Sequence, residues 1–181
     1  MRISIYFFTT VLISIVGVAM PIVAQASSVS GSMPAAIVAT PSWLIIPSIG
    51  LNARIQGVGV TAQGAMAVPS GVSKLVGWYK HGVVPGQAGS AVIDAHVFAA
   101  FSKLKYLKPG ADVYVIMTNG TTLHFVVSVA KTFALATLSP QQQLFRSTLS
   151  ADLNLITCAG SLTSDHSTYD HRLIVYTTLV G

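Results

Sequence analysis

The chain has 181 residues, of which 52% are hydrophobic and only 8% carry a charged side chain. This composition excludes a disordered polyampholyte, a coiled coil and a collagen-like fibre, and the length suits one domain. The net charge is +5, but the ten Lys and Arg residues are scattered singly. We therefore expect no nucleic-acid partner, and the positive excess favours a negatively charged envelope surface.

The N-terminus has the features of an export segment. Arg2 is followed by an uncharged, mostly apolar stretch up to Ala24, and Ala24-Gln25-Ala26 has the small residues of a cleavage site. The stretch is also close to the roughly 20 residues that span a bilayer. We predict either a cleaved signal peptide or a retained membrane anchor over 1–26. Both alternatives place the remaining chain outside the cytoplasm, on the extracytoplasmic face of the membrane or in the cell envelope.

A linker follows, and then a domain with the pattern of short strands. Residues 27–40 are rich in Ser, Ala and Gly, which is typical of a flexible linker, and the compact domain is predicted over 41–181. The predicted strands combine β-branched, aromatic and alternating residues, and they cover 43–46, 48–55, 91–96, 112–118, 121–129, 153–158 and 172–180. Asn119-Gly120 predicts a hairpin between two of them, because both residues tolerate the positive φ of a type I′ turn.

Helix is a minor component of the predicted domain. Apolar residues at every third position over 98–107 predict one or two helical turns. Ser139 and Pro140 suit the cap and the first position of a second short helix. Many short strands with little helix predict an all-β fold, either a closed β-barrel or a sandwich.

Three residues at the ends of predicted strands have the chemistry of acyl transfer. The only cysteine, Cys158, ends one strand, His96 ends another, and Arg172 begins the last. A thiol reacts as the thiolate, which a neighbouring base or positive charge favours. Arg carries a permanent charge that stabilises a developing oxyanion, and this chemistry needs no metal or cofactor. A lone exported cysteine can also be an inert buried thiol or an intermolecular partner.

The remaining histidines are predicted to be non-catalytic. The segment 164–171 offers two His and two Asp, but it has no recognised spacing of metal ligands, so we expect a solvated loop without metal. His171 neighbours Arg172 on a predicted strand and therefore faces the opposite side. His124 and His81 are predicted to lie on the surface.

The local sequences around these residues resemble the sortase family. The segment Leu155-Ile-Thr-Cys-Ala-Gly160 is similar to the Leu-x-Thr-Cys strand of sortases, and Tyr169-Asp-His-Arg-Leu-Ile-Val175 is similar to the next strand with its arginine. The segments that resemble the histidine-bearing part of sortases are 76–79, 85–96, 101–104 and 108–113. The resemblance covers about Trp43 to Leu179 in the family's order, and it is closest to the class E and F branches.

The resemblance implies a closed β-barrel of about eight strands with short helices, and a transpeptidase activity. Cys158 would attack the threonyl carbonyl of a Leu-Pro-x-Thr-Gly-like sorting signal on a surface protein. The resulting thioacyl-enzyme would be resolved by an amine of a peptidoglycan precursor or of a pilin-like surface protein. His96 would transfer protons, Arg172 would hold the carbonyl and stabilise the oxyanion, and Thr157 would help to bind the signal. We expect a monomer.

The sequence departs from the family at two places, and two other functions remain open. Ala95 stands where sortases commonly have glycine, and the stretch 97–101 lacks a polar residue that many members carry. We expect these differences to affect substrate preference more than the chemistry. The first alternative function is a thiol hydrolase or peptidase of the same fold, with water replacing the amine. The second is a non-enzymatic cell-surface β-barrel domain in which Cys158 is buried.

Overall fold

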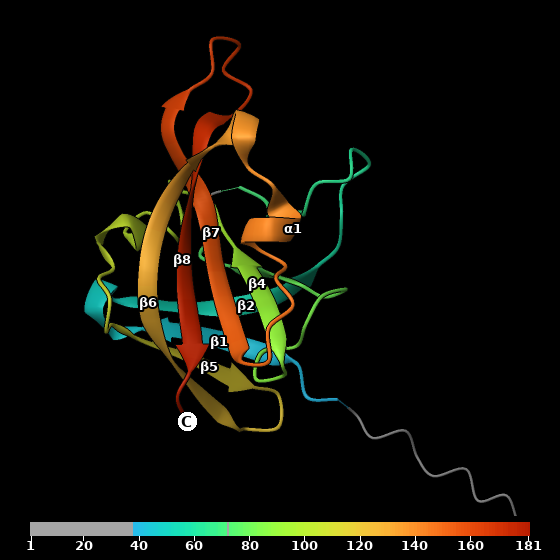
Figure 1. The fold of residues 1–181 in the computed structure, drawn as a ribbon, viewed down its shortest axis with the longest axis vertical. Helices are drawn as coiled ribbons and strands as arrows, with labels where there is room; N and C mark the ends of the chain where they lie inside the picture. Colours follow the sequence, from blue (N-terminus) through green and yellow to red (C-terminus); the bar gives the residue numbers. More distant parts are fainter. Residues whose placement is uncertain (1–37, 72) are drawn as a thin grey trace, which may run out of the picture. The chain divides into compact units, whose positions relative to one another are not determined.

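A computed structural model describes residues 38–71 and 73–181 (Figure 1). The export segment predicted over 1–26 lies outside the described residues, as does most of the linker predicted over 27–40. Within the described part of the chain, no helix is both long enough and apolar enough to cross a bilayer.

The described chain forms an eight-stranded barrel that is closed in the order β1-β2-β3-β4-β7-β8-β6-β5 (Figure 1). The strands are β1 Pro41–Ile46, β2 Leu51–Val58, β3 Val76–Tyr79, β4 Gly89–Asp94, β5 Asp112–Met117, β6 Thr122–Ala134, β7 Ala151–Leu162 and β8 Tyr169–Leu179. Two neighbouring pairs, β2 with β3 and β4 with β7, are parallel, and the other pairs are antiparallel. The predicted all-β barrel is therefore confirmed.

Short helices connect the strands. They are η1 Pro47–Ile49, η2 Leu104–Tyr106, η3 Leu135–Thr137 and α1 Pro140–Gln143. The first three are 3-10 turns, and α1 is a single α-helical turn that begins with proline, as Ser139-Pro140 predicts. The turns predicted over 98–107 are also present, and they end in η2.

The start of β2 differs from the prediction. The sequence pattern predicts a strand over 48–55, but Pro47 opens η1 and Gly50 ends it with a left-handed φ of 65°. Proline has a fixed φ that suits the first residue of a helical turn, and glycine adopts a positive φ without steric penalty. Strand pairing therefore begins only at Leu51. The sequence prediction also missed β3, which has four residues and includes a glycine.

The hairpin predicted at Asn119-Gly120 joins β5 and β6. The backbone N–H of Met117 donates to the carbonyl of Thr121 (2.8 Å), and that of Gly120 donates to the carbonyl of Met117 (3.0 Å). Gly120 has a φ of 85°, but Asn119 does not have a positive φ. The connection is therefore not the predicted type I′ turn, which needs positive φ at both positions. It is a longer connection in which only the glycine is left-handed.

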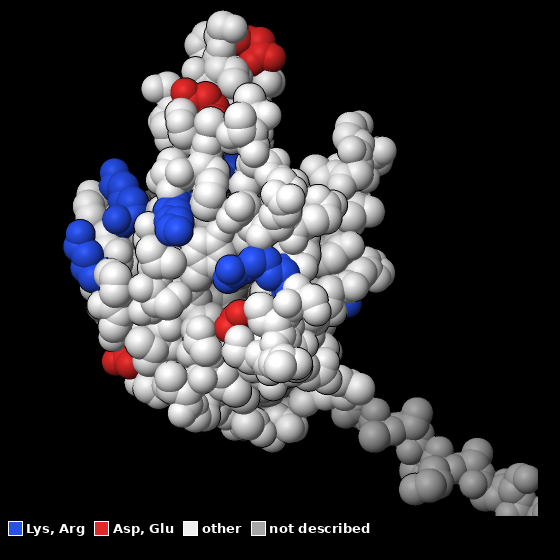
Figure 2. Space-filling view, in the orientation of Figure 1, with Lys and Arg blue, Asp and Glu red and all other residues white. Residues whose placement is uncertain are grey.

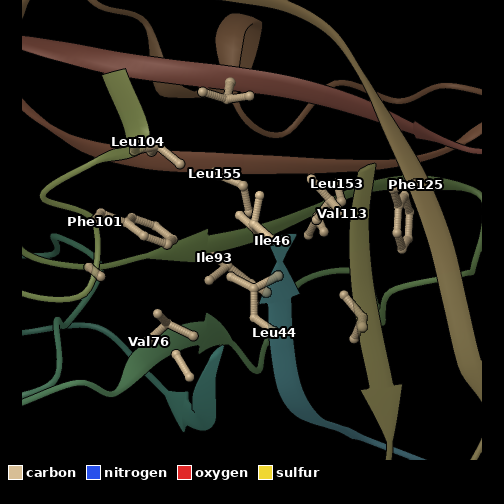
Figure 3. Packing of buried hydrophobic residues seen from close by; sticks show 14 of the residues in the cluster. Leu44, Ile46, Val76, Ile93, Phe101, Leu104, Val113, Phe125, Leu153 and Leu155 are labelled. Carbon is tan, nitrogen blue, oxygen red and sulfur yellow. The ribbon is translucent and has the colours of Figure 1, made fainter. Parts of the chain in front are cut away.

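The barrel interior forms the main hydrophobic core. Inward-facing side chains such as Leu44, Ile93, Phe125 and Leu155 are fully buried, and Phe101 from the turns after β4 packs among them (Figure 3). Burying one such side chain stabilises the folded state by about 1.5–3 kcal/mol. The interior therefore favours one register, because a slip of one residue would turn these side chains outward.

A second, smaller cluster lies on the outer face of β4, β7 and β8. Side chains alternate along a strand, so Ile156 and Ile174 point away from the interior that Leu155 and Val175 fill. Leu144, at the end of α1, packs against this outer face. The connection between β6 and β7 therefore covers part of the barrel's outside.

Leu155→Ala should lower the free energy of unfolding by about 2–5 kcal/mol, because it leaves a cavity among buried neighbours. Leu149 is fully exposed, so Leu149→Ala is the matched control and should change stability by less than about 0.5 kcal/mol. Urea unfolding followed by circular dichroism measures both. Equal losses in the two variants would contradict the placement of Leu155 in the core.

Candidate active site

Three adjacent strands bring His96, Cys158 and Arg172 to one end of the outer face. Strand β7 lies between β4 and β8, and Cys158 pairs directly with Arg172 across β7 and β8. The parallel register of β4 and β7 pairs Asp94 with Ile156, which places His96 beside Cys158 two residues further along. Cys158 and Arg172 are directly opposite and therefore share one face of the sheet, and His96, which follows β4, lines the same groove.

The three side chains line one groove of about 940 Å³. Its floor is the outer face of β4, β7 and β8, and its walls come from the β2–β3, β6–β7 and β7–β8 connections. The apolar side chains that line it include Met66, Val68, Leu135, Leu138, Leu144 and Phe145. A concave apolar surface with a few polar groups at one end is typical of a ligand-binding site.

Cys158 is the nucleophile candidate of the groove. Its side chain is partly exposed, and it forms no disulfide. At Cys158 the backbone of β7 is paired with Arg172 of β8, and two residues earlier Ile156 is also paired with Asp94 of β4. The sulfur is thus accessible from the groove while its position is held by the sheet.

The guanidinium of Arg172 is held by the start of β8 and by the last residue of the connection between β7 and β8. Nη1 donates to the carbonyl oxygens of Tyr169 and His171, both at 2.8 Å, and Nη2 donates to Oγ1 of Thr168 at 2.9 Å. Three hydrogen bonds orient the planar group and its permanent charge. Sequence analysis did not identify Thr168, because only the folded loop brings its hydroxyl to the guanidinium.

Short polar contacts close this β7–β8 loop. The carboxylate of Asp165 accepts hydrogen bonds from the side chain of Thr163 and from the backbone and side chain of Ser167. These bonds, with that of Thr163 the strongest, lower the pKa of Asp165 to about 2. His166 between them has a φ of 54°, a conformation that non-glycine residues adopt rarely. The hairpin extends beyond the rest of the barrel, and acidic atoms lie near its end (Figures 1 and 2).

The acidic and histidine side chains of the segment 164–171 contact each other or solvent. Residues 164–167 are exposed, as predicted for a solvated loop. Nδ1 of His171 lies 2.8 Å from Oδ1 of Asp170, and this contact is the main cause of the lowered pKa of Asp170. Across residues 38–71 and 73–181, no three His, Cys, Asp or Glu side chains are grouped so that they could hold a metal ion.

The other histidines occupy different environments. His124 lies on β6, where it is 2.8 Å from Asp112 and stacked on Tyr114 of β5, and His81 is exposed after β3. Both positions agree with the predicted surface locations. His166 does line the groove, a placement that the sequence pattern did not reveal.

The imidazole of His96 stacks on the ring of Phe98. Their centroids are 4.8 Å apart, and their planes are 13° from parallel. Phe98 is 58% exposed and lines the groove, whereas Phe101 is buried in the barrel core. The apolar stretch 97–101 therefore provides one aromatic neighbour for His96 and one anchor for the turns behind it.

Thr157 and Ala95 connect the histidine segment to β7. Thr157 is only 4% exposed, and its hydroxyl donates to the carbonyl of Ala95 at 2.7 Å. Ala95 itself belongs to the core of the barrel. This bond fixes the chain immediately before His96 against β7. That Thr157 helps to bind a substrate stays a prediction.

Asp94 is a titratable group of the groove that sequence analysis missed. It lies two residues before His96 and lines the same groove. Its Oδ1 is buried and has no hydrogen-bond partner among the described residues. Burial raises the pKa of Asp94 to about 7, and the positive charge of Arg172 opposes this effect only in part. The available signal was a lone carboxyl group at spacing i, i+2 from His96 on a predicted strand.

Comparisons with known proteins identify related sequences and folds. The sequence model of the sortase domain matches residues 44–180, and no curated protein matches the chain. Similar solved structures include sortase C1 of Streptococcus agalactiae, with 22% identity, a TM-score of 0.58, and 77% of this chain and 67% of that chain covered. A lid mutant of sortase A from Corynebacterium diphtheriae has 19% identity and a TM-score of 0.60, with 78% of this chain and 70% of that chain covered. Sortase C-1 of Actinomyces oris has 23% identity and a TM-score of 0.59, with 77% of this chain and 71% of that chain covered.

Asp94→Asn should stabilise the protein at neutral and alkaline pH. The folded pKa of about 7 exceeds the ordinary 3.8, so the native state binds more protons between about pH 4 and 7, and its stability falls as pH rises through this window. At about 1.4 kcal/mol per pKa unit, the variant should be more stable than the wild type by about 2–4 kcal/mol at pH 8, and by almost nothing at pH 4.

Urea unfolding at pH 4, 6 and 8 measures this difference. Asp112→Asn removes an exposed carboxylate outside the groove and is the matched control. A gain that is equal at all three pH values would contradict the titration of Asp94 in this range.

Proposed function

The chain belongs to the sortase family of transpeptidases, and we propose that it uses Cys158, His96 and Arg172 to cleave a Leu-Pro-x-Thr-Gly-like sorting signal and to join the cleaved protein to an amine. The observation that carries this proposal is that the three side chains line one groove, where Cys158 and Arg172 are paired across β7 and β8 and His96 follows β4. Thiol, imidazole and guanidinium are the groups that acyl transfer through a thioester requires.

In the first half of the reaction, the thiolate of Cys158 attacks the threonyl carbonyl carbon. A C–S bond forms, and the carbonyl electron pair moves to oxygen, where the guanidinium of Arg172 stabilises the oxyanion. When the oxyanion collapses, the peptide C–N bond breaks. The imidazolium of His96 gives its proton to the leaving amine, and a thioacyl-enzyme remains.

In the second half, an amine attacks the thioester carbonyl carbon. His96 takes the proton of the attacking amine, a new C–N bond forms, and the C–S bond breaks to regenerate the thiolate. If water enters in place of the amine, the product is a free carboxylic acid, which is the outcome of the alternative thiol hydrolase. The partly exposed thiol favours either enzyme over a barrel domain with an inert, buried cysteine.

The groove supports an extended peptide as the substrate. Its lining is apolar along the β2–β3 and β6–β7 connections and polar at the strand ends, so the apolar part of a signal would lie against the walls while its threonyl carbonyl reaches Cys158. Thr157 would contribute through its bond to Ala95, which fixes the strand end that the peptide meets.

The cellular setting follows from the predicted export segment over 1–26. We propose that the enzyme is a monomer at the extracytoplasmic face of the membrane, or in the envelope if the segment is cleaved. Its partners would be surface proteins with sorting signals and an amine of a peptidoglycan precursor or of a pilin. The quoted motifs favour the class E and F branches of the family.

Wild-type protein incubated with a library of sorting-signal peptides should form an acyl adduct on Cys158, detectable by mass spectrometry. Cys158→Ala should form none and should keep its melting temperature within about 2 °C, since the thiol is partly exposed. An added peptidoglycan-like amine should convert the adduct into a ligated product. Hydrolysed peptide alone, in the presence of that amine, would support the thiol hydrolase, and turnover by Cys158→Ala would refute the nucleophile.

Thr168→Val should lower kcat/KM by about tenfold, because the guanidinium of Arg172 loses one of its three orienting hydrogen bonds. Thr168→Ser keeps a hydroxyl and should restore most of the activity. In an Arg172→Lys background, which lacks the planar fork, the same valine substitution should have little further effect. Additive losses in this double-mutant cycle would show that Thr168 acts independently of Arg172.

A further inference from the structure

Asp94 is the acidic side chain of the groove, and the proposed reaction assigns it no step. It is the last residue of β4 and pairs with Ile156 of β7, two residues before Cys158 on the same face. With strands about 4.8 Å apart and a rise of about 6.6 Å per two residues, the Cα atoms of Asp94 and Cys158 are separated by roughly 8 Å. Asp94 is therefore close enough to the thiol for its charge to matter.

The charged and titratable groups around Asp94 come from β3, β7 and β8, from the residues after β4 and from the β7–β8 loop. They are Tyr79 of β3, His96 after β4, Cys158 of β7, His166 and Tyr169 at the β7–β8 loop, and Arg172 of β8. Arg172 is the permanent cation among them, and Asp94 is the one acid among the described lining residues. The β2–β3 and β6–β7 connections contribute no charged side chain to the lining.

No local contact neutralises a charge on Asp94. Its Oδ1 has no hydrogen-bond partner among the described residues. The nitrogens of Arg172 donate instead to Thr168, Tyr169 and His171. The guanidinium nevertheless acts on Asp94 through space, and coupling between two sites is reciprocal. A carboxylate at Asp94 thus reduces the positive field that Arg172 provides in the groove.

We propose that Asp94 is a positioning residue that controls the reactivity of Cys158: its ionised carboxyl group offsets the field of Arg172 and disfavours the thiolate, and its neutral form does not. The coupling itself needs only the groove, whereas its consequence for transpeptidation rests on the proposed function. Burial raises the pKa of Asp94 to about 7. The carboxyl group is therefore neutral in mildly acidic solution, and it begins to reduce the field of Arg172 as pH rises through neutrality.

The distance between Asp94 and Cys158 sets how strongly the charge of Asp94 changes the reactivity of the thiol. A unit charge at roughly 8 Å, at an effective dielectric constant of about 40 to 80, changes a thiolate equilibrium by about twofold to sixfold. The wild-type thiol should therefore gain reactivity with pH less steeply than a thiol beside a neutral residue.

The test is the rate of iodoacetamide alkylation of Cys158 between pH 5.5 and 8, in the wild type and in Asp94→Asn. Asn has the same shape as Asp and removes only the charge. The rates should be equal at pH 5.5, and the variant should react about twofold to fourfold faster at pH 8, where most of Asp94 is ionised. Asp112→Asn, which lowers the negative charge outside the groove, should follow the wild type at every pH.

Equal rates at every pH, or a rate ratio that does not change with pH, would overturn the proposal, because a merely structural role has no such titration. If Asp94→Asn does not fold, Asp94→Ala removes the same charge and should show the same pH-dependent gain. Alkylation needs no sorting signal. A pH-dependent gain without any acyl adduct from peptides would thus uphold the charge coupling and reject the transpeptidase.

Discussion

The pairing of β7 with β4 on one side and β8 on the other is the constraint on which the groove depends. The antiparallel register sets Cys158 opposite Arg172, and the parallel register brings the end of β4 beside them. Because side chains alternate, the same strands bury Leu155 and Val175 in the barrel interior. A register shift of one residue between β7 and β8 would expose this core and displace Cys158 from Arg172. The interactions that stabilise the barrel therefore also fix the proposed catalytic geometry.

The side chains of Arg172 and His96 differ in how many contacts restrain their conformation. Arg172 has three hydrogen bonds, two to backbone carbonyls at the start of β8 and one to Thr168 in the loop that Asp165 and its neighbours close. His96 stacks on the exposed ring of Phe98 and follows the Thr157–Ala95 bond. An oxyanion needs a preorganised charge, whereas a residue that first donates and then accepts a proton benefits from some rotation. The difference in support matches the difference between the two roles.

Local sequence patterns predicted β4, β7, β8 and a hairpin between β5 and β6, because alternation and turn residues are local properties. They did not give the strand bounds: Cys158 and Arg172, predicted at strand ends, lie within β7 and β8. The parallel pairs β2–β3 and β4–β7 join segments distant in the chain, and no local pattern specifies them. Thr168 and Asp94 were missed for the same reason. The hydrogen bond between the Thr168 hydroxyl and Arg172, and the burial of the Asp94 carboxyl group, exist only after the loop and the sheet have formed.

Asp94 shows how a destabilising residue is retained in a fold. Oδ1 of its carboxyl group is buried and has no hydrogen-bond partner among residues 38–71 and 73–181, and a buried charge without a partner disfavours the folded state. Neutral asparagine would fit the same volume without that penalty, so stability alone does not explain an acid at this position. An acid whose pKa lies at about 7 beside the field of Arg172 makes the charge of the groove depend on pH near neutrality. The same burial that reduces stability therefore gives the groove a charge that responds to its surroundings.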